Sequence, residues 1–392
     1  MIRGVIIFIV LTNLYLYLKL RSGFGGGRWN LFYLLWAVAW GVLPFITRSG
    51  RVTSGRWGEV LFSLGFTWVA IVGMACMIFL FTDLLSLLSR LVDALAGTTF
   101  TARFFIPARR VPGTLILVIL VVGYSFFEAW NVRPVYVTLT TSKPLPSKPA
   151  PSGEKKSLRL VHLTDIHLGG LHGSGRLKRL MEIVRAAQPD LLVITGDLVD
   201  GDMAGRDADA AELASNGARY GAFIVPGNHD YYSGIDRALA FMKKAKLTVL
   251  RGQSVMAGDI TLMGLDDPAR SGIGITQGER LPEGLVFPKG PFVLLLKHRP
   301  QVLPETIGLF DLQLSGHTHG GQIWPFGYLA ARLNKSVQHL SFHSAPPDAE
   351  GRSERKSAVY VSNGVGFWGP PLRFLTPPEV TIIDLVSEPE GN

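Results

Sequence analysis

The sequence predicts a chain of two parts, an all-α region of four transmembrane helices followed by an α/β domain. Three observations support this division. Hydrophobic residues make up 47% of the 392 residues and charged residues only 18%, whereas soluble domains average about 25% charged residues. Long apolar runs fill most of the first 130 residues. After residue 157, short apolar runs instead end repeatedly in Gly, Asp, Asn or His.

The predicted membrane region contains four apolar runs, each near the roughly 20 residues that a helix needs to cross a bilayer. The runs cover residues 5–20, 29–46, 60–82 and 112–130. Buried core helices of a soluble domain are the alternative, but four such runs so close together favour membrane spans. The first run could instead be a signal peptide because Arg3 precedes it. Since no small-residue cleavage site follows, we expect a retained helix.

Residues 84–95 are also apolar, with charges interspersed. They form either a short helix lying in the membrane interface or an extension of the third span.

The charges are unevenly distributed along the chain. Residues 1–150 hold 14 Lys/Arg and 4 Asp/Glu, and the remainder holds 25 and 26. A nucleic-acid-binding protein would carry its basic excess on the folded domain, so we expect no nucleic-acid partner. Basic residues are slightly more numerous in the loops after the first and third runs, and such loops face the cytoplasm. This excess slightly favours an outward-facing C-terminal domain. The single Cys76 excludes an intramolecular disulfide and a CxxC metal or redox site.

A segment rich in Pro, Ser, Thr and Lys, TLTTSKPLPSKPAPSGEKK, separates the two parts. Such a composition cannot bury a core, and its prolines keep the chain extended. We therefore predict a transmembrane region at 1–137, a linker at 138–156 and the second domain at 157–387.

A strand–helix–strand unit opens the second domain. The runs LRLVHL and DLLVITGD predict buried strands. Between them Leu177, Leu180 and Val184 recur at helical spacing, with Ser174 as the expected N-cap and Pro189 as the stop. This pattern is typical of an α/β fold, in which ligands gather at the carboxyl ends of the strands.

Five motifs at such strand ends supply side chains that bind metals. Carboxylate, imidazole and amide groups suit divalent Mn, Fe, Co or Zn. Seven ligands exceed the four of a tetrahedral zinc, so we expect two metal ions that share one carboxylate. Glycines at 196, 227 and 316 would allow close approach of the backbone. The seven expected ligands are Asp165, His167, Asp197, Asn228, His298, His317 and His319.

Other polar and aromatic residues have simpler interpretations. We expect His162, His172, His339 and His343 to be core or surface residues. Asp200, Asp202, Asp207 and Asp209 predict a solvated acidic loop, and Asp266 and Asp267 predict a turn. Phe326, Phe367 and Trp368 are either core residues or an apolar rim that meets the membrane or an acyl chain.

The motifs D-x-H, G-D, G-N-H-D, a lone His and G-H-x-H follow one another over residues 158–385. In this order they resemble the signature of the calcineurin-like metallophosphoesterases. The segments GGQIWPFG and SNGVGFWGPPLRF are similar to a membrane-associated bacterial branch that includes UDP-diacylglucosamine pyrophosphatases. The resemblance implies an αββα sandwich and a hydrolase that uses a metal-bridging hydroxide without a covalent enzyme intermediate.

The resemblance also implies roles for individual residues. Asp165, His167 and His319 would hold one metal, and Asn228, His298 and His317 the other. Asp197 would bridge the two metals. His229 would face the substrate and protonate the leaving oxygen, and Asp230 would orient His229. Phe367 and Trp368 are the expected substrate contacts.

We therefore expect an enzyme anchored in the bacterial cytoplasmic (inner) membrane. Its expected partners are the lipid bilayer and a phosphorylated lipid-linked or nucleotide-linked substrate, cleaved at a phosphodiester or pyrophosphate bond. One alternative is an exported cell-wall phosphodiesterase with the same chemistry. Another is a non-catalytic membrane sensor or transporter, although no mid-helix charge supports it.

Overall fold

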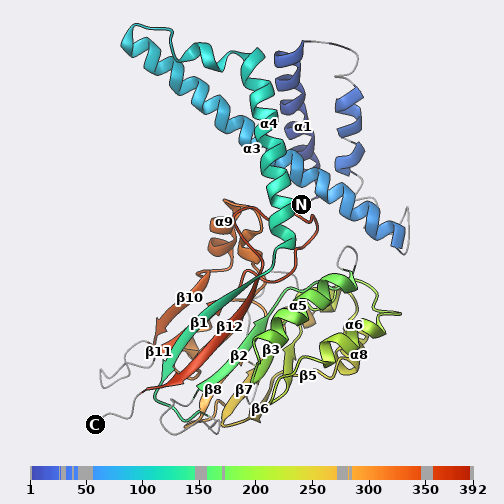
Figure 1. Ribbon diagram of the computed structural model, residues 1–392, viewed down its shortest axis with the longest axis vertical. Helices are drawn as coiled ribbons and strands as arrows, with labels where there is room; N and C mark the ends of the chain where they lie inside the picture. Colours follow the sequence, from blue (N-terminus) through green and yellow to red (C-terminus); the bar gives the residue numbers. More distant parts are fainter. Residues whose placement is uncertain are drawn as a thin grey trace. The chain divides into compact units, whose positions relative to one another are not determined.

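The computed structural model (Figure 1) describes residues 2–25, 27, 32–37, 39–42, 56–145, 157–169, 173–271, 281, 285–345 and 356–388. The chain divides into two compact units. The first, here called the helical unit, comprises Met1–Phe127 and Trp368–Leu372. The second, the α/β unit, comprises Glu128–Phe367 and Arg373–Asn392. Each unit is described by itself.

The helical unit contains α1 (Ile2–Phe24), α3 (Arg56–Ala96), the short 3-10 helix η1 (Ala102–Phe105) and most of α4 (Pro107–Trp130). Two stretches in the described chain, Ser63–Ala96 and Pro107–Trp130, are long and apolar enough to cross a membrane. Of the four expected spans, two are therefore supported as candidate membrane helices in the described chain. The second predicted run is helical at 32–37 and 39–42, and its other residues lie outside the described chain. Residues 84–95 extend α3, which was one of the two alternatives.

Three helices of this unit pack together along their apolar runs. Leu16 of α1, Cys76 and Phe79 of α3, and Val118 of α4 belong to one buried cluster. At one end of the cluster, Asp83 of α3 forms ion pairs with Lys19 at 2.5 Å and Arg110 at 3.0 Å. These charges lie beside the ends of the three apolar runs. The ion pairs therefore join α1, α3 and α4 at the same end of the buried cluster.

The α/β unit contains two six-stranded sheets. The first has the order β1 (Arg133–Thr141), β12 (Glu379–Ser387), β2 (Ser157–Leu163), β3 (Leu191–Thr195), β4 (Ala222–Val225) and β5 (Thr248–Val249). The second has the order β10 (His339–Ser344), β11 (Lys356–Val361), β9 (Leu312–Ser315), β8 (Phe292–Leu296), β7 (Ile260–Gly264) and β6 (Gln253–Ala257). Both sheets are mixed: strands β2 to β5 are parallel, as are β11, β9, β8 and β7. The predicted α/β class is confirmed.

The layers of the α/β unit are set by which strand faces are apolar. Helices α5 (Ser174–Ala186), α6 (Asp207–Ala214) and α8 (Ile235–Lys244) bury their apolar faces against one side of the first sheet. The two sheets share a second buried cluster between them. The outer face of the second sheet packs on Leu281, Leu285, Phe287 and Val302, which lie in loops. The expected fourth, helical layer is therefore replaced by loops in the described chain.

Helix α5 is positioned by its cap and its buried face. The helix begins at Ser174 and its N-cap is Gly173, so the predicted N-cap is displaced by one residue. Leu177, Leu180 and Val184 are buried as predicted, together with Met181. The helix ends at Ala186, shortly before Pro189.

The predicted linker begins too early in the sequence. Residues 133–141 form β1, which pairs in parallel with β12 from Arg133–Glu379 to Thr141–Ser387. Lys143 then forms an ion pair with Asp311 at 2.7 Å, and Leu145 is buried. The alternation of RPVYVTLTT suits an edge strand, and β1 lies at the edge of the first sheet. Residues 146–156 lie outside the described chain.

Candidate metal centre

The five motifs converge at one edge of the sheets, as their positions at strand ends predict. Those after β2, β3 and β4 belong to the first sheet, and those after β8 and β9 to the second. Their side chains form three groups in which the metal-binding atoms lie within 4.8 Å of one another. The groups are Asp165, His167 and His319; His167, Asp197 and His229; and Asp197, His298 and His317.

The first group corresponds to one of the two expected metal sites. The Nε2 atoms of His167 and His319 are 3.2 Å apart. His319 Nε2 is also 3.4 Å from Asp165 Oδ1. All three residues are buried. The structure thus brings together the ligand set that the resemblance implies for the first metal.

The third group, Asp197, His298 and His317, corresponds to the other expected site. His298 Nε2 lies 3.2 Å from Asp197 Oδ2, 3.2 Å from Asn228 Oδ1 and 3.1 Å from His317 Nδ1. Asp197 Oδ2 is also 3.8 Å from His167 Nε2, a member of the first group. Asp197 therefore lies between the two groups, where a shared carboxylate is expected.

The hydrogen bonding of His298 shows that a cation fits this donor set. His298 Nδ1 faces the carbonyl oxygen of Thr195 at 2.8 Å, so Nδ1 is the nitrogen that keeps its proton when the ring is neutral, as it is in a metal ligand. Nε2 then presents a lone pair to Asp197, Asn228 and His317, and the Asp197 and Asn228 oxygens are also acceptors. A divalent cation would satisfy all of these atoms at once.

The pKa values of this pair are consistent with a site that attracts positive charge. Burial lowers the pKa of His298, but Asp197 outweighs burial and raises that pKa to about 10. Burial likewise raises the pKa of Asp197, but His298 and His229 hold it well below the usual range. The pair therefore favours an anionic carboxylate beside positive charge.

His229 lies beside the centre, but its expected partner is wrong. Its Nδ1 lies 3.3 Å from Asp200 Oδ1, and its backbone N–H donates to Asp197 Oδ1 at 2.8 Å. Asp230 instead accepts hydrogen bonds from the backbone N–H groups of Gly227 and Val199. Burial, together with Asp197, raises the pKa of Asp230 to about 7. Asp230 therefore shapes the loop, and Asp200 contacts His229.

Asp200 is the functional candidate that sequence reasoning missed, since we expected a solvated loop. It also lies 3.6 Å from His167 Nδ1, so it contacts two rings of the centre. Asp209 is buried and paired with Arg206 at 2.9 Å, which also differs from a solvated loop. Sequence position offered one signal, because Asp200 follows Asp197 by three residues.

Three of the histidines expected to be core or surface residues, His162, His339 and His343, belong to none of the three groups. The fourth, His172, is not among the described residues. His162 is fully buried in β2 and bonds Thr195 Oγ1 at 2.7 Å, and burial lowers its pKa to about 3. Asp266 and Asp267 form ion pairs with Arg251 and Arg299, so they do more than make a turn.

The two aromatic residues expected at the substrate differ in their surroundings. Phe367 is only 2% exposed and packs against Trp130 at 5.7 Å and under the Arg176 guanidinium. This burial contradicts a direct substrate contact and supports the core alternative. Trp368 is 37% exposed and lies 5.8 Å from the ring of Phe66 in the helical unit. Phe326 is 46% exposed.

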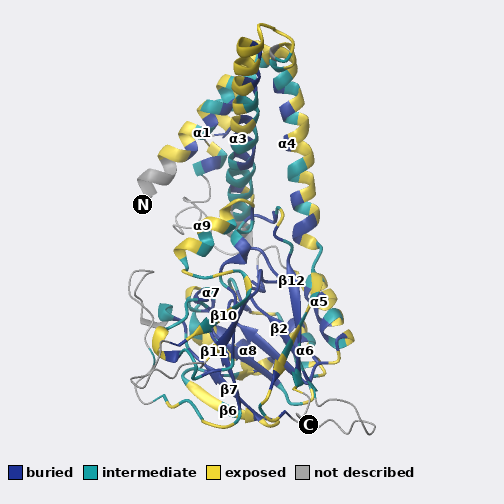
Figure 2. Cartoon of the chain, turned by 90° about the vertical axis from the view of Figure 1, so that its left-hand side faces the viewer, coloured by how far each residue is buried: buried dark blue, intermediate teal, exposed yellow. Residues whose placement is uncertain are grey.

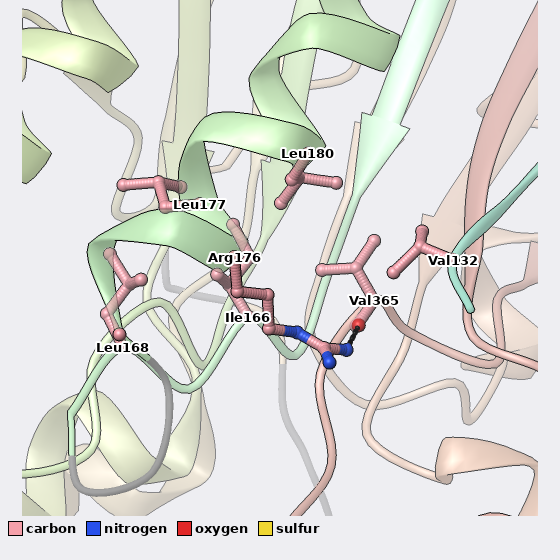
Figure 3. A pocket seen from close by; sticks show the side chains of 8 residues that line it. Val132, Ile166, Leu168, Arg176, Leu177, Leu180 and Val365 are labelled. Atoms are coloured by element: carbon pink, nitrogen blue, oxygen red, sulfur yellow. Dashed lines mark hydrogen bonds between the residues drawn. The ribbon is translucent and has the colours of Figure 1, made fainter. Parts of the chain in front are cut away.

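A small apolar pocket lies between the loop after β2 and helix α5 (Figure 3). It is lined by Ile166, Leu168, Leu177 and Val365, and Arg176 donates a hydrogen bond to the Val365 carbonyl oxygen at 2.5 Å. This arrangement fixes the loop after β2 against α5, so the pocket belongs to the packing that supports the centre.

The segment after β11 also supports the centre. The Arg373 side chain is fully buried and donates to the carbonyl oxygens of Asn363 at 2.7 Å, Gly366 at 2.6 Å and Thr376 at 2.9 Å. Its guanidinium also lies 3.3 Å from His319 Nδ1. Arg373 therefore holds the backbone of the segment SNGVGFWGPPLRF next to His319, one of the expected metal ligands.

Comparison with known proteins agrees with this geometry. Residues 158–321 match the family model described as calcineurin-like phosphoesterase. An uncharacterized metallophosphoesterase of Aquifex aeolicus is 33% identical over 279 residues, 69% of this chain and 98% of the relative. One of Campylobacter jejuni is 36% identical over 59% of this chain and 60% of the relative.

A third relative bears on the helices. A zebrafish (Danio rerio) protein described as a transmembrane protein with metallophosphoesterase domain is 32% identical over 58% of this chain and 53% of that protein. This relative and the two long apolar helices suggest membrane association. The centre is consistent with two metal ions. Because almost the whole Aquifex relative is matched, the chain belongs to the calcineurin-like metallophosphoesterases, hydrolases that act on phosphoesters.

Proposed function

We propose that this protein is a membrane-anchored phosphoesterase that hydrolyses a phosphodiester or pyrophosphate bond in a lipid-linked or sugar-nucleotide substrate. The observation that carries the proposal is the position of Asp197 between two adjacent groups of buried metal-binding side chains. Such a spacing suits a pair of cations that contact the same phosphoryl group.

The roles of the ligands follow from the two groups. Asp165, His167 and His319 would hold one cation, Asn228, His298 and His317 would hold the other, and Asp197 would be the shared ligand. Bound Mn, Fe, Zn or Co ions would polarise the phosphoryl oxygen and lower the pKa of water. Because the ligands come from both sheets, the fold itself fixes the distance between the two sites.

His229 is the proposed proton donor to the leaving oxygen. Asp200 faces its Nδ1 at 3.3 Å, which leaves Nε2 as the ring nitrogen that can reach a substrate. The backbone bond from His229 to Asp197 holds the ring beside the bridging carboxylate. The exposed ring of Tyr232 lies 5.3 Å from His229 and borders the same approach.

Membrane anchoring favours a substrate at the bilayer. The ion pairs of Asp83 with Lys19 and Arg110 join the three apolar helices side by side. The zebrafish relative is described as a transmembrane protein. The motif resemblance to UDP-diacylglucosamine pyrophosphatases favours a diacylated sugar nucleotide. A bacterial inner membrane with the α/β unit outside fits the charge distribution, and an alkaline phosphatase fusion after Asn392 would test the side.

The activity is tested with purified full-length protein in detergent. We expect Mn²⁺-dependent hydrolysis of bis-p-nitrophenyl phosphate that a chelator abolishes, and turnover within a panel of phospholipids and sugar nucleotides. His229→Ala should lower kcat at least about 100-fold, the lower range for a positioned proton donor. His343→Ala, a strand residue outside the three groups, is the matched control. An inactive panel with metal-loaded protein would contradict the proposal.

A further inference from the structure

Helix α9 (Phe326–Leu333) presents an uncovered apolar surface in the α/β unit. None of its residues is buried (Figure 2). Tyr328, Leu329 and Leu333 are 75%, 52% and 71% exposed, and Trp324 and Phe326 beside them are 49% and 46% exposed. We call these five residues the α9 patch. A cluster of large exposed apolar side chains typically marks a surface that contacts a membrane, a ligand or another protein.

Among Lys, Arg, Asp and Glu, the segment that carries the α9 patch contains only basic residues. Arg332 and Lys335 are exposed at its edge. Residues 322–345 contain no Asp or Glu. A helix with an apolar face and basic neighbours is typical of segments that lie in the interface of an anionic membrane.

Hydrogen bonds connect the segment before α9 to the end of α4, within the α/β unit. Glu128, near the end of α4, accepts a bond from Thr376 N–H at 3.3 Å. Thr376 Oγ1 donates to the Gln322 carbonyl oxygen at 2.5 Å, and Trp324 N–H donates to the Phe374 carbonyl oxygen at 2.9 Å. The α9 patch therefore begins close to the residues where a candidate membrane span ends.

The same segment continues from the metal centre. His319 lies in the 3-10 helix η4 (His319–Gly321), and the chain reaches Trp324 three residues after that helix ends. Gly321 leaves no room for a side chain, because an added Cβ would lie 2.2 Å from Gly327 N at the start of α9. The position of α9 is thus fixed relative to the first ligand group.

We propose that the α9 patch inserts into the surface of the lipid bilayer that anchors the chain, with Arg332 and Lys335 at anionic headgroups. This inference rests on the membrane anchoring in the proposed function, and it adds the docking surface and its partner. It explains how a centre at the strand ends reaches a phosphoester located in the headgroup region without extracting the lipid from the membrane.

The test measures where α9 lies in a bilayer, without reference to activity. The only cysteine, Cys76, is replaced by Ser, and nitroxide labels are attached singly to Leu333→Cys, Met256→Cys and Leu120→Cys in full-length protein. Met256 on β6 and Leu120 on α4 are exposed by 60% and 64%, so they serve as water and lipid references. One copy is placed in each nanodisc of phosphatidylcholine and phosphatidylglycerol.

We expect the label at Leu333 to collide with lipid-soluble oxygen severalfold more, relative to a water-soluble nickel chelate, than the label at Met256. Arg332→Gln with Lys335→Gln should reduce that difference in discs containing phosphatidylglycerol. A water-exposed Leu333 label beside a lipid-exposed Leu120 label would overturn the inference. Protection of Leu333 only in discs with two copies would also overturn it, since a second chain would be the partner. A water-exposed Leu120 label would instead contradict the anchoring itself.

Discussion

Five side chains of the candidate centre stand on backbone with positive φ: 55° at Asp165, 52° at His167 and Asp197, 70° at His317 and 50° at His319. Residues other than glycine rarely adopt this region, and each such residue costs of order 1–3 kcal/mol. The surrounding packing maintains the conformation. It turns each side chain toward the same small volume, which ordinary strand ends would not do.

Glycines next to the ligands are required by the closeness of the side chains. A Cβ at Gly316 would lie 2.3 Å from Asp165 Oδ2, and one at Gly227 would lie 2.2 Å from Asp197 Oδ1. We expected these glycines to let the backbone approach the metals. In the structure, Gly316 and Gly227 instead lie against the carboxylates of Asp165 and Asp197, which are expected metal ligands.

Asp200 gives the residue-scale prediction. Burial alone would raise the pKa of Asp200, but the adjacent rings of His167 and His229 outweigh it and keep that pKa below its usual value. Asp200→Asn keeps the size of the side chain and removes the charge that orients both rings. We expect kcat to fall about 10- to 100-fold, the usual cost of losing a carboxylate behind metal-binding histidines. Steady-state kinetics at saturating Mn²⁺ measures this.

Asp202→Asn is the matched control, because Asp202 is exposed and, among the described contacts, accepts a hydrogen bond only from the backbone N–H of Ala204. Its kcat should stay within about twofold of the wild-type value, as surface substitutions have small effects. Equal activity of Asp200→Asn and the wild type would show that Asp200 does not position His229. Shifts in the pH profile of kcat would distinguish a positioning effect from a loss of folded protein.

At the scale of elements, strands from the two sheets are joined at their ends by polar side chains. Glu379 begins β12 in the first sheet, and His339 begins β10 in the second. His339 Nε2 lies 3.5 Å from Glu379 Oε2, and Tyr360 of β11 donates to Glu379 Oε1 at 2.9 Å. This carboxylate therefore links three strands beside the segment that supports the centre.

The His339–Glu379 pair predicts a pH-dependent part of the stability. The hydrogen bond that His339 donates to the Glu379 carboxylate raises the pKa of His339 above its ordinary value of 6.5. A raised pKa in the folded state stabilises the protein fully below 6.5, and this contribution is lost as the pH rises through the raised value. His339→Gln should therefore lower the free energy of unfolding more at pH 5.5 than at pH 9.

The effect is small, about 0.5 kcal/mol or less, because the His339 side chain is 52% exposed. Denaturant unfolding at the two pH values, followed by circular dichroism, measures it. His343→Gln on the same strand is the control, since His343 bonds only Ser341 among the described contacts. A loss that is equal at both pH values would contradict the assigned ion pair.

The predictability of the elements depended on how local their signals are. The strands before Asp165, Asp197 and His317 were predictable because each is a short apolar run that ends in polar residues. β1 was missed because its partner, β12, lies more than 200 residues later in the sequence. The αββα expectation came from resemblance, and loops rather than helices cover the outer face of the second sheet.

Across the whole molecule, the grouping of seven polar residues was predictable because all of them follow strands. Their roles as ligands stay a prediction. The contacts of Asp200 and Asp230 were not predictable, because both follow strand ends and only the loop conformation decides which reaches His229. Among the described residues, two of the four expected spans are supported as candidate membrane helices. The sequence left open where the third span ends, and α3 continues to Ala96.

Metal binding should stabilise the whole α/β unit, because the expected ligands join its two sheets. Asp165, His167, Asp197 and Asn228 follow strands of the first sheet, and His298, His317 and His319 follow strands of the second. Cations that bind only the folded state add about 2.7 kcal/mol at a free concentration of 100 times Kd. We therefore expect Mn²⁺ to raise the thermal unfolding midpoint by several degrees over chelator-treated protein, measured by differential scanning fluorimetry. Asp197→Ala should abolish this difference, whereas His343→Ala should retain it. A midpoint that is insensitive to metal in the wild type, under conditions where elemental analysis shows two bound ions, would mean that the sheets are not linked through them.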